Sequence, residues 1–114
     1  MVKVVVTTKL EKEVIKRLSK KEADDVFLFM ASLEENPFRG DVITAVGSVI
    51  LKELKHKNFR FYFIHSANVF KLLSEEELQQ EILKFVAMSG KGKEQQQVIN
   101  RIKAEIKSFG FDWF

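Results

Sequence analysis

Two neighbouring stretches of alternating residues, 49–54 and 59–65, constrain the fold of this chain more than any other part. They predict two β-strands joined by a short turn at 56–58. In the second stretch, three phenylalanines alternate with Arg60 and Tyr62. Successive side chains of a strand point to opposite faces, so the phenylalanines share one face and Arg60 and Tyr62 share the other. We expect the phenylalanine face in the core, and Arg60 and Tyr62 on an open face of the sheet.

The first third of the chain predicts a strand followed by two helices. Residues 2–7 are rich in β-branched side chains and predict the strand. Apolar residues at helical spacing over 10–18 predict the first helix. Ser19 and Glu22 form a capping box that begins the second helix, and Pro37 follows its end. We expect a helical hairpin lying on a sheet.

The remaining segments predict further strands and a final helix. The stretch 38–48 is the least regular, and 69–73 predicts another strand. Residues 82–88 favour a strand, while a helix over 75–85 stays open as the alternative. The apolar stripe within 94–108 predicts a helix. This order predicts the α+β class, with an antiparallel sheet, helices on one face and the other face free to carry function.

Length and composition narrow the choice of function. A chain of 114 residues fits a single domain, which we assign to 1–114. No cysteine is present, and the two histidines are not spaced as a metal-binding pair, so we expect neither metal nor cofactor. The sequence has no apolar run long enough for a membrane span, which makes the cytoplasm the default location. The net charge of +3 is compatible with a nucleic-acid partner without requiring one.

Several motifs together resemble the RelE/ParE toxin superfamily, especially its HigB-like and archaeal members. They are Asn36-Pro37 followed by Gly40, the Leu-Lys-Glu-Leu-Lys run at 51–55, the Arg-Phe-Tyr-Phe run at 60–63, and Ser-Gly-Lys at 89–91 before a glutamine-bearing helix. The order and spacing of these motifs carry the resemblance, which covers roughly 10–110. It implies a small twisted antiparallel sheet with an N-terminal helical hairpin and a C-terminal helix.

The resemblance also implies a function. The chain is expected to be the toxin component of a type II toxin–antitoxin system, inhibiting translation as a ribosome-dependent mRNA endonuclease, or mRNA interferase. Such an endoribonuclease needs no metal, because an RNA 2′-hydroxyl attacks the adjacent phosphorus and leaves a cyclic phosphate or a 3′-phosphate. The implied partners are an antitoxin protein, mRNA and the ribosome, and a homo- or hetero-oligomer stays open.

Four cations take their expected roles from positions in the family pattern. Arg60 matches the arginine that contacts the scissile phosphate, and Lys55 matches the basic residue that closes the preceding strand. Lys91 and Lys93 match the basic turn after the last strand, where a helix start also attracts anions. The tyrosine or histidine that the family places near its C-terminus has no match in this chain.

The other candidate site residues are less constrained. Tyr62 and His65 are the candidates for proton transfer, since a general acid and a general base are both needed. Lys52, Ser89 and Gln96 are candidates for contact with RNA phosphates. Each has a plainer alternative, such as a core-edge tyrosine, a capping serine or a solvated glutamine.

Three further alternatives stay open at this point. Arg60 is equally well placed to pair with Glu53 across the hairpin. The missing C-terminal acid–base residue favours a non-catalytic protein-binding module with the same fold. A DNA-binding regulator is a third function that a basic sheet allows.

Overall fold

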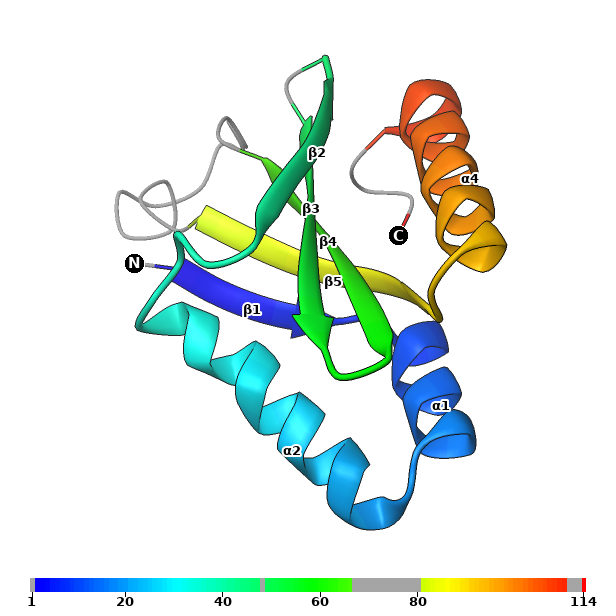
Figure 1. Cartoon of the computed structure of the whole chain (residues 1–114). Helices are drawn as coiled ribbons and strands as arrows, with labels where there is room; N and C mark the ends of the chain where they lie inside the picture. Colours follow the sequence, from blue (N-terminus) through cyan, green and yellow to red (C-terminus); the bar gives the residue numbers. More distant parts are fainter. Residues whose placement is uncertain (1, 48, 67–80, 111–113) are drawn as a thin grey trace.

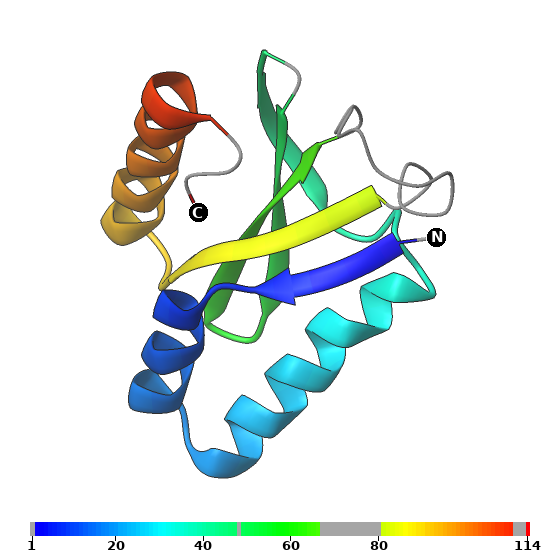
Figure 2. The ribbon, with the colours of Figure 1, turned by 180° about the vertical axis from the view of Figure 1, so that it is seen from behind.

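The computed structural model of the chain describes residues 2–47, 49–66, 81–110 and 114, and it shows a twisted five-stranded sheet with helices against both faces (Figures 1 and 2). The strands are β1 (Val2–Val6), β2 (Asp41–Val46), β3 (Val49–His56), β4 (Phe59–Ser66) and β5 (Glu81–Ser89). The helices are α1 (Thr8–Arg17), α2 (Lys20–Ala31), the short 3-10 helix η1 (Ser32–Glu34) and α4 (Lys93–Phe109).

The sheet order is β1-β5-β4-β3-β2. The pairs β2–β3, β3–β4 and β4–β5 are antiparallel, whereas β1 pairs parallel with β5. The predicted α+β class, with its N-terminal helical hairpin and C-terminal helix, is confirmed, and the sheet is mixed rather than wholly antiparallel. A parallel pair needs a long connection, which the chain between β1 and β5 provides.

Both helices of the hairpin begin where the sequence places a capping side chain. The hydroxyl of Thr7 accepts a hydrogen bond from the backbone N–H of Leu10, at 3.3 Å. The hydroxyl of Ser19 accepts one from the N–H of Glu22, at 3.2 Å. Each bond satisfies one of the N–H groups that a helix start leaves without a partner, so these residues fix where the helices begin.

The sheet separates two apolar cores. On one face, Phe61, Phe63 and Phe85 pack against α1 and α2, as the phenylalanine pattern predicts. On the other face, Tyr62 packs among residues of β3, β4 and β5 under the apolar stripe of α4. The expectation that the face with Arg60 and Tyr62 is open is therefore wrong. The physical reason is that burial of the apolar stripe of α4 is favourable, and this face of the sheet provides the apolar surface against which the stripe packs.

Two strand predictions need correction or completion. The stretch predicted as irregular contains the edge strand β2, whose alternation is interrupted by a register shift between Val42 and Thr44. The strand predicted over 82–88 is confirmed as β5, so residues 81–85 are not helical. The strand predicted over 69–73 lies outside the described residues.

None of the helices in the described part of the chain is long and apolar enough to cross a membrane.

Gly40 is required at the start of β2. Its φ of +100° lies in the region that favours glycine, and an added Cβ would meet the Phe63 ring at 2.9 Å. We predict that Gly40→Ala lowers the free energy of unfolding by roughly 2–4 kcal/mol, combining backbone strain with overpacking. Gly47→Ala is the control, because Gly47 has a φ of +61° and open space around it, and it should cost about 1–2 kcal/mol. Urea unfolding of both variants tests this, and equal losses would contradict it.

Candidate functional site

The register of the sheet brings several of the predicted site residues to one end of the molecule. Lys55 of β3 lies opposite Arg60 of β4, and Arg60 lies opposite Ser89 of β5. Lys91 lies in the turn that follows β5, and Lys93 is the first residue of α4 (Figure 1). The hairpin tip, the end of β5 and the start of α4 therefore meet at the same end of the sheet.

Arg60 is turned inward at this end. Its Nε lies 3.1 Å from Oε1 of Glu53, and the two side chains are only 13% and 4% exposed. The Nε–H does not point at the carboxylate, so the contact is a close ion pair rather than an aligned hydrogen bond. The alternative of pairing with Glu53 is the one present.

The rest of the Arg60 guanidinium caps the hairpin turn. Its Nη1 donates to the carbonyl oxygen of Lys57 at 3.3 Å and to that of Phe59 at 3.1 Å. Lys57 has a φ of 54°, which is unusual for a residue other than glycine. Arg60 thus stabilises a tight turn and neutralises a buried carboxylate, and in this state it does not face solvent.

The first turn of α4 joins the same pair. Nε2 of Gln95 donates to the Glu53 carboxylate oxygens at 3.4 and 3.3 Å, long distances that indicate weak hydrogen bonds. The glutamine predicted for the site was Gln96, but its amide donates to Asn100 at 2.9 Å on the exposed side of α4. Gln95 is therefore the glutamine that reaches the ion pair.

Tyr62 and Ser89 form a buried hydroxyl pair beneath α4. Their oxygens lie 2.9 Å apart, and neither residue is accessible to solvent. Burial raises the pKa of Tyr62, and the Glu53 carboxylate acts in the same direction, while the hydrogen bond with Ser89 and the charge of Arg60 partly oppose the shift. The phenol is therefore held neutral inside the protein, away from solvent.

A second ion pair braces the basic turn from the outside. Oε1 of Glu94 lies 2.6 Å from Nη1 of Arg17 and accepts a hydrogen bond from the Gly90 N–H at 3.1 Å. The Arg17 guanidinium also lies over the Phe59 ring, 5.4 Å from its centre. The hydrogen bond from Arg17, followed by that from Gly90, lowers the pKa of Glu94. This brace ties α1 to the turn before α4, and sequence reasoning missed it.

Four exposed lysines remain around this end, and we call Lys55, Lys57, Lys91 and Lys93 the lysine rim. Within the described residues, none of the four side chains forms an ion pair or hydrogen bond. Their ammonium groups are carried by a hairpin and a turn that the two ion pairs hold in place. Uncompensated ammonium groups on a fixed framework suit phosphate oxygens.

Two predicted site residues are not part of this group. Lys52 projects to the opposite face of the sheet, where its Nζ lies 6.0 Å from the centre of the Phe63 ring. His65 lies opposite Ile50 and Leu83, five residues along β4 from Arg60, or about 16 Å at the usual rise of a strand. The fold therefore separates both residues from the rim.

Among the described residues, no three histidine, aspartate or glutamate side chains lie close enough together to hold a metal ion.

The arrangement of these elements is a RelE-like fold. One chain of the crystal structure of the archaeal RelE–RelB complex from Pyrococcus horikoshii OT3 matches it with a TM-score of 0.57. The match covers 81% of this chain and 97% of that chain, at 16% sequence identity. At such identity the likeness shows the fold alone. No model of a known protein family matches the sequence, and a search of curated proteins found no match.

The buried pair makes a prediction about stability. Arg60→Met leaves the Glu53 carboxylate buried without a counter-charge, so we expect the free energy of unfolding to fall by roughly 3–5 kcal/mol. The same change at exposed Lys55 should alter it by no more than about 0.5 kcal/mol. Urea unfolding measures both. The double variant Glu53→Met with Arg60→Met should lose less than Arg60→Met alone, and a larger loss would contradict a coupled pair.

Tyr62 is the single tyrosine of the chain, so tyrosinate absorbance reports this residue alone. Its raised pKa means that the unfolded chain ionises first, near the ordinary value of about 10. The free energy of unfolding should therefore fall as the pH rises above that value, and tyrosinate should appear later in the folded protein than in urea. Tyr62→Phe should remove this contribution to the slope. Ionisation of the folded protein at the ordinary pKa would contradict a buried phenol.

Proposed function

We propose that this chain is the toxin component of a type II toxin–antitoxin system, and that its lysine rim binds RNA. The RelE-like fold supports the first part of the proposal. The observation that carries the second is the set of four exposed, unpaired lysines at one braced end of the sheet. The matching archaeal RelE is complexed with RelB, and we propose an antitoxin partner for this chain as well.

The proposed reaction is cleavage of mRNA without a metal. The 2′-hydroxyl oxygen forms a bond to the adjacent phosphorus, and the bond from phosphorus to the 5′-oxygen breaks, leaving a cyclic phosphate that hydrolyses to a 3′-phosphate. The attacking hydroxyl gives its proton to a base, and the leaving oxygen takes one from an acid. The ammonium groups of the rim would stabilise the negative charge that builds on the phosphorane oxygens.

The chain's own contribution is mainly electrostatic in this proposal. The rim consists of lysines, Tyr62 is buried and His65 lies five residues along β4 from Arg60. His56, between Lys55 and Lys57, is half-buried, with its ring against that of Phe29. Arg60 acts here as a positioning residue that holds the hairpin under Lys55. We propose that water or groups of the ribosome take the proton of the 2′-hydroxyl and protonate the leaving oxygen. The ribosome would also hold the mRNA with its 2′-hydroxyl in line for attack, since orientation alone can lower such a barrier greatly.

A second candidate function is a non-catalytic protein-binding module with the same fold. The observation that favours it is the closed state of Arg60 and Tyr62, both of which the nuclease interpretation would have placed in contact with RNA. In that case the lysine rim would bind an acidic protein surface, and no mRNA would be cleaved.

Expression of the chain on its own distinguishes the two functions. We expect growth arrest and cleavage of translated mRNA, mapped by sequencing of 5′ ends, and loss of both effects in the triple variant Lys55→Gln, Lys91→Gln and Lys93→Gln. The matched control removes three exposed lysines from α1 and α2 with Lys12→Gln, Lys16→Gln and Lys20→Gln. Both triple variants remove three positive charges, so a difference between them reports position and not net charge. We expect only the rim variant to lose toxicity, with at least about ten times more surviving cells than the unaltered chain gives.

Different results of this experiment would reject the lysine rim or the nuclease. Growth arrest that both triple variants relieve equally would assign the effect to overall charge and reject the rim. Intact messages and normal growth at high expression would reject the nuclease and support the binding module. A salt titration of RNA affinity gives an independent check, since contacts with phosphates weaken steeply as salt increases.

A further inference from the structure

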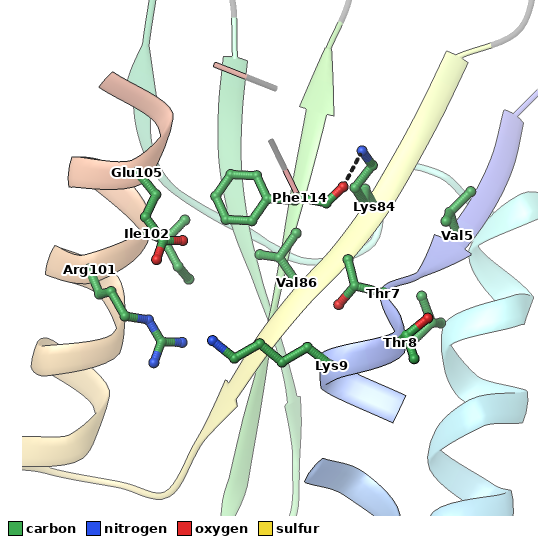
Figure 3. Close-up of a pocket in the computed structure, with 11 residues that line it drawn as sticks. Val5, Thr7, Thr8, Lys9, Lys84, Val86, Arg101, Ile102, Glu105 and Phe114 are labelled. Atoms are coloured by element: carbon green, nitrogen blue, oxygen red, sulfur yellow. Dashed lines mark hydrogen bonds between the residues drawn. The ribbon is translucent and has the colours of Figure 1, made fainter. Parts of the chain in front are cut away.

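A groove separate from the lysine rim lies between α4 and the part of the sheet formed by β1 and β5 (Figure 3). Its volume is about 650 Å³, within the range of binding pockets for small ligands or a few side chains. The walls come from the end of β1, the start of α1, β5 and the middle of α4. Arg101, on its wall, is eight residues after Lys93, which is about 12 Å along the helix.

Two cations face each other across this groove. Lys9 reaches over from α1, and Arg101 reaches from α4, so that their charged ends point toward one another (Figure 3). Both residues are exposed, and neither makes a hydrogen bond or ion pair with any described residue. An anion placed between two cations that point toward one another is attracted by both. Glu105 carries the single acidic side chain of the lining, against the cationic side chains of Lys9, Lys84 and Arg101.

The floor of the groove is apolar and already accommodates a residue of this chain. Val86 and Ile102 are buried at its base, and the Phe114 side chain packs against the same core. Beside it, Nζ of Lys84 donates to the Phe114 carbonyl oxygen at 2.9 Å. The groove thus holds an apolar side chain on its floor and an oxygen acceptor at its cationic edge.

From this combination we infer that the groove binds an acidic, apolar segment of a protein partner. A carboxylate of the segment lies between Lys9 and Arg101, and an apolar side chain packs on Val86 and Ile102 beside Phe114. The aliphatic floor and the carboxylate of Glu105 favour such a segment over RNA, whose phosphates Glu105 repels. The inference rests on the proposed function only in expecting a protein partner.

The test uses the full chain and two labelled synthetic peptides, followed by fluorescence anisotropy at low salt. One is an amphipathic helix of leucine and glutamate, and the other replaces each glutamate with lysine. We expect the leucine–glutamate peptide alone to bind. The variant Lys9→Glu with Arg101→Glu should weaken it by at least about tenfold, because like charges then meet in the groove. Lys9→Gln with Arg101→Gln should give a smaller loss.

The matched control reverses two other exposed lysines of the same helices, Lys12→Glu and Lys107→Glu, which do not line the groove. It should bind the peptide nearly as well as the unaltered chain. Equal binding of the two peptides, or equal losses in the two charge-reversed variants, would overturn the inference. Displacement of the peptide by a short oligouridine, with RNA binding lost in the Lys9 and Arg101 variant, would assign the groove to RNA instead.

The result also separates this inference from the proposed function, because the assay needs neither a ribosome nor an effect on growth. A chain that arrests growth but fails to bind the peptide would refute the groove assignment alone. A chain that binds the peptide but leaves messages intact would refute the nuclease and retain the groove.

Discussion

The ion pair between Glu53 and Arg60 is the interaction on which the candidate site depends. Burying two charges is costly unless they meet and their remaining polar atoms find partners. Here the guanidinium also bonds two carbonyl oxygens of the turn, and Gln95 contributes its amide to the carboxylate. The pair therefore stabilises the turn of the β3–β4 hairpin, the packing of α4 on the sheet, and the position of Lys55 opposite Arg60.

Covering both faces of the sheet changes how cations can act in this fold. A charged side chain that projects under a covering helix must find a partner inside the protein, as Glu53 does with Arg60. Besides the lysines on the outer surfaces of α1 and α2, exposed cations lie at the end of the sheet and along the margin of α4. The lysine rim and the groove near Arg101 occupy these two places, and the helix separates them.

The positions of most helices and strands could be predicted from the sequence, but which helix covers each face of the sheet could not. Alternation over 59–65 correctly predicted which side chains of β4 share a face, but it could not show that α4 covers the face bearing Tyr62. The stripe of α4 implied a second apolar surface, which was the signal for that cover. β2 was missed because the register shift after Val42 interrupts its alternation. The contact of Arg17 with Glu94 joins residues far apart in the chain, so no local sequence pattern predicts it.

The parallel pairing of β1 with β5 has a consequence for how the protein is made. Val2 aligns with Glu81, so β1 is synthesised well before β5, the strand that pairs with it. Pairings between distant segments form slowly, because the intervening chain must first lose its freedom. The helical hairpin that follows β1 packs over the same strands. A chain released early in synthesis would lack a completed sheet, and its phenylalanines would remain open to chaperones and proteases.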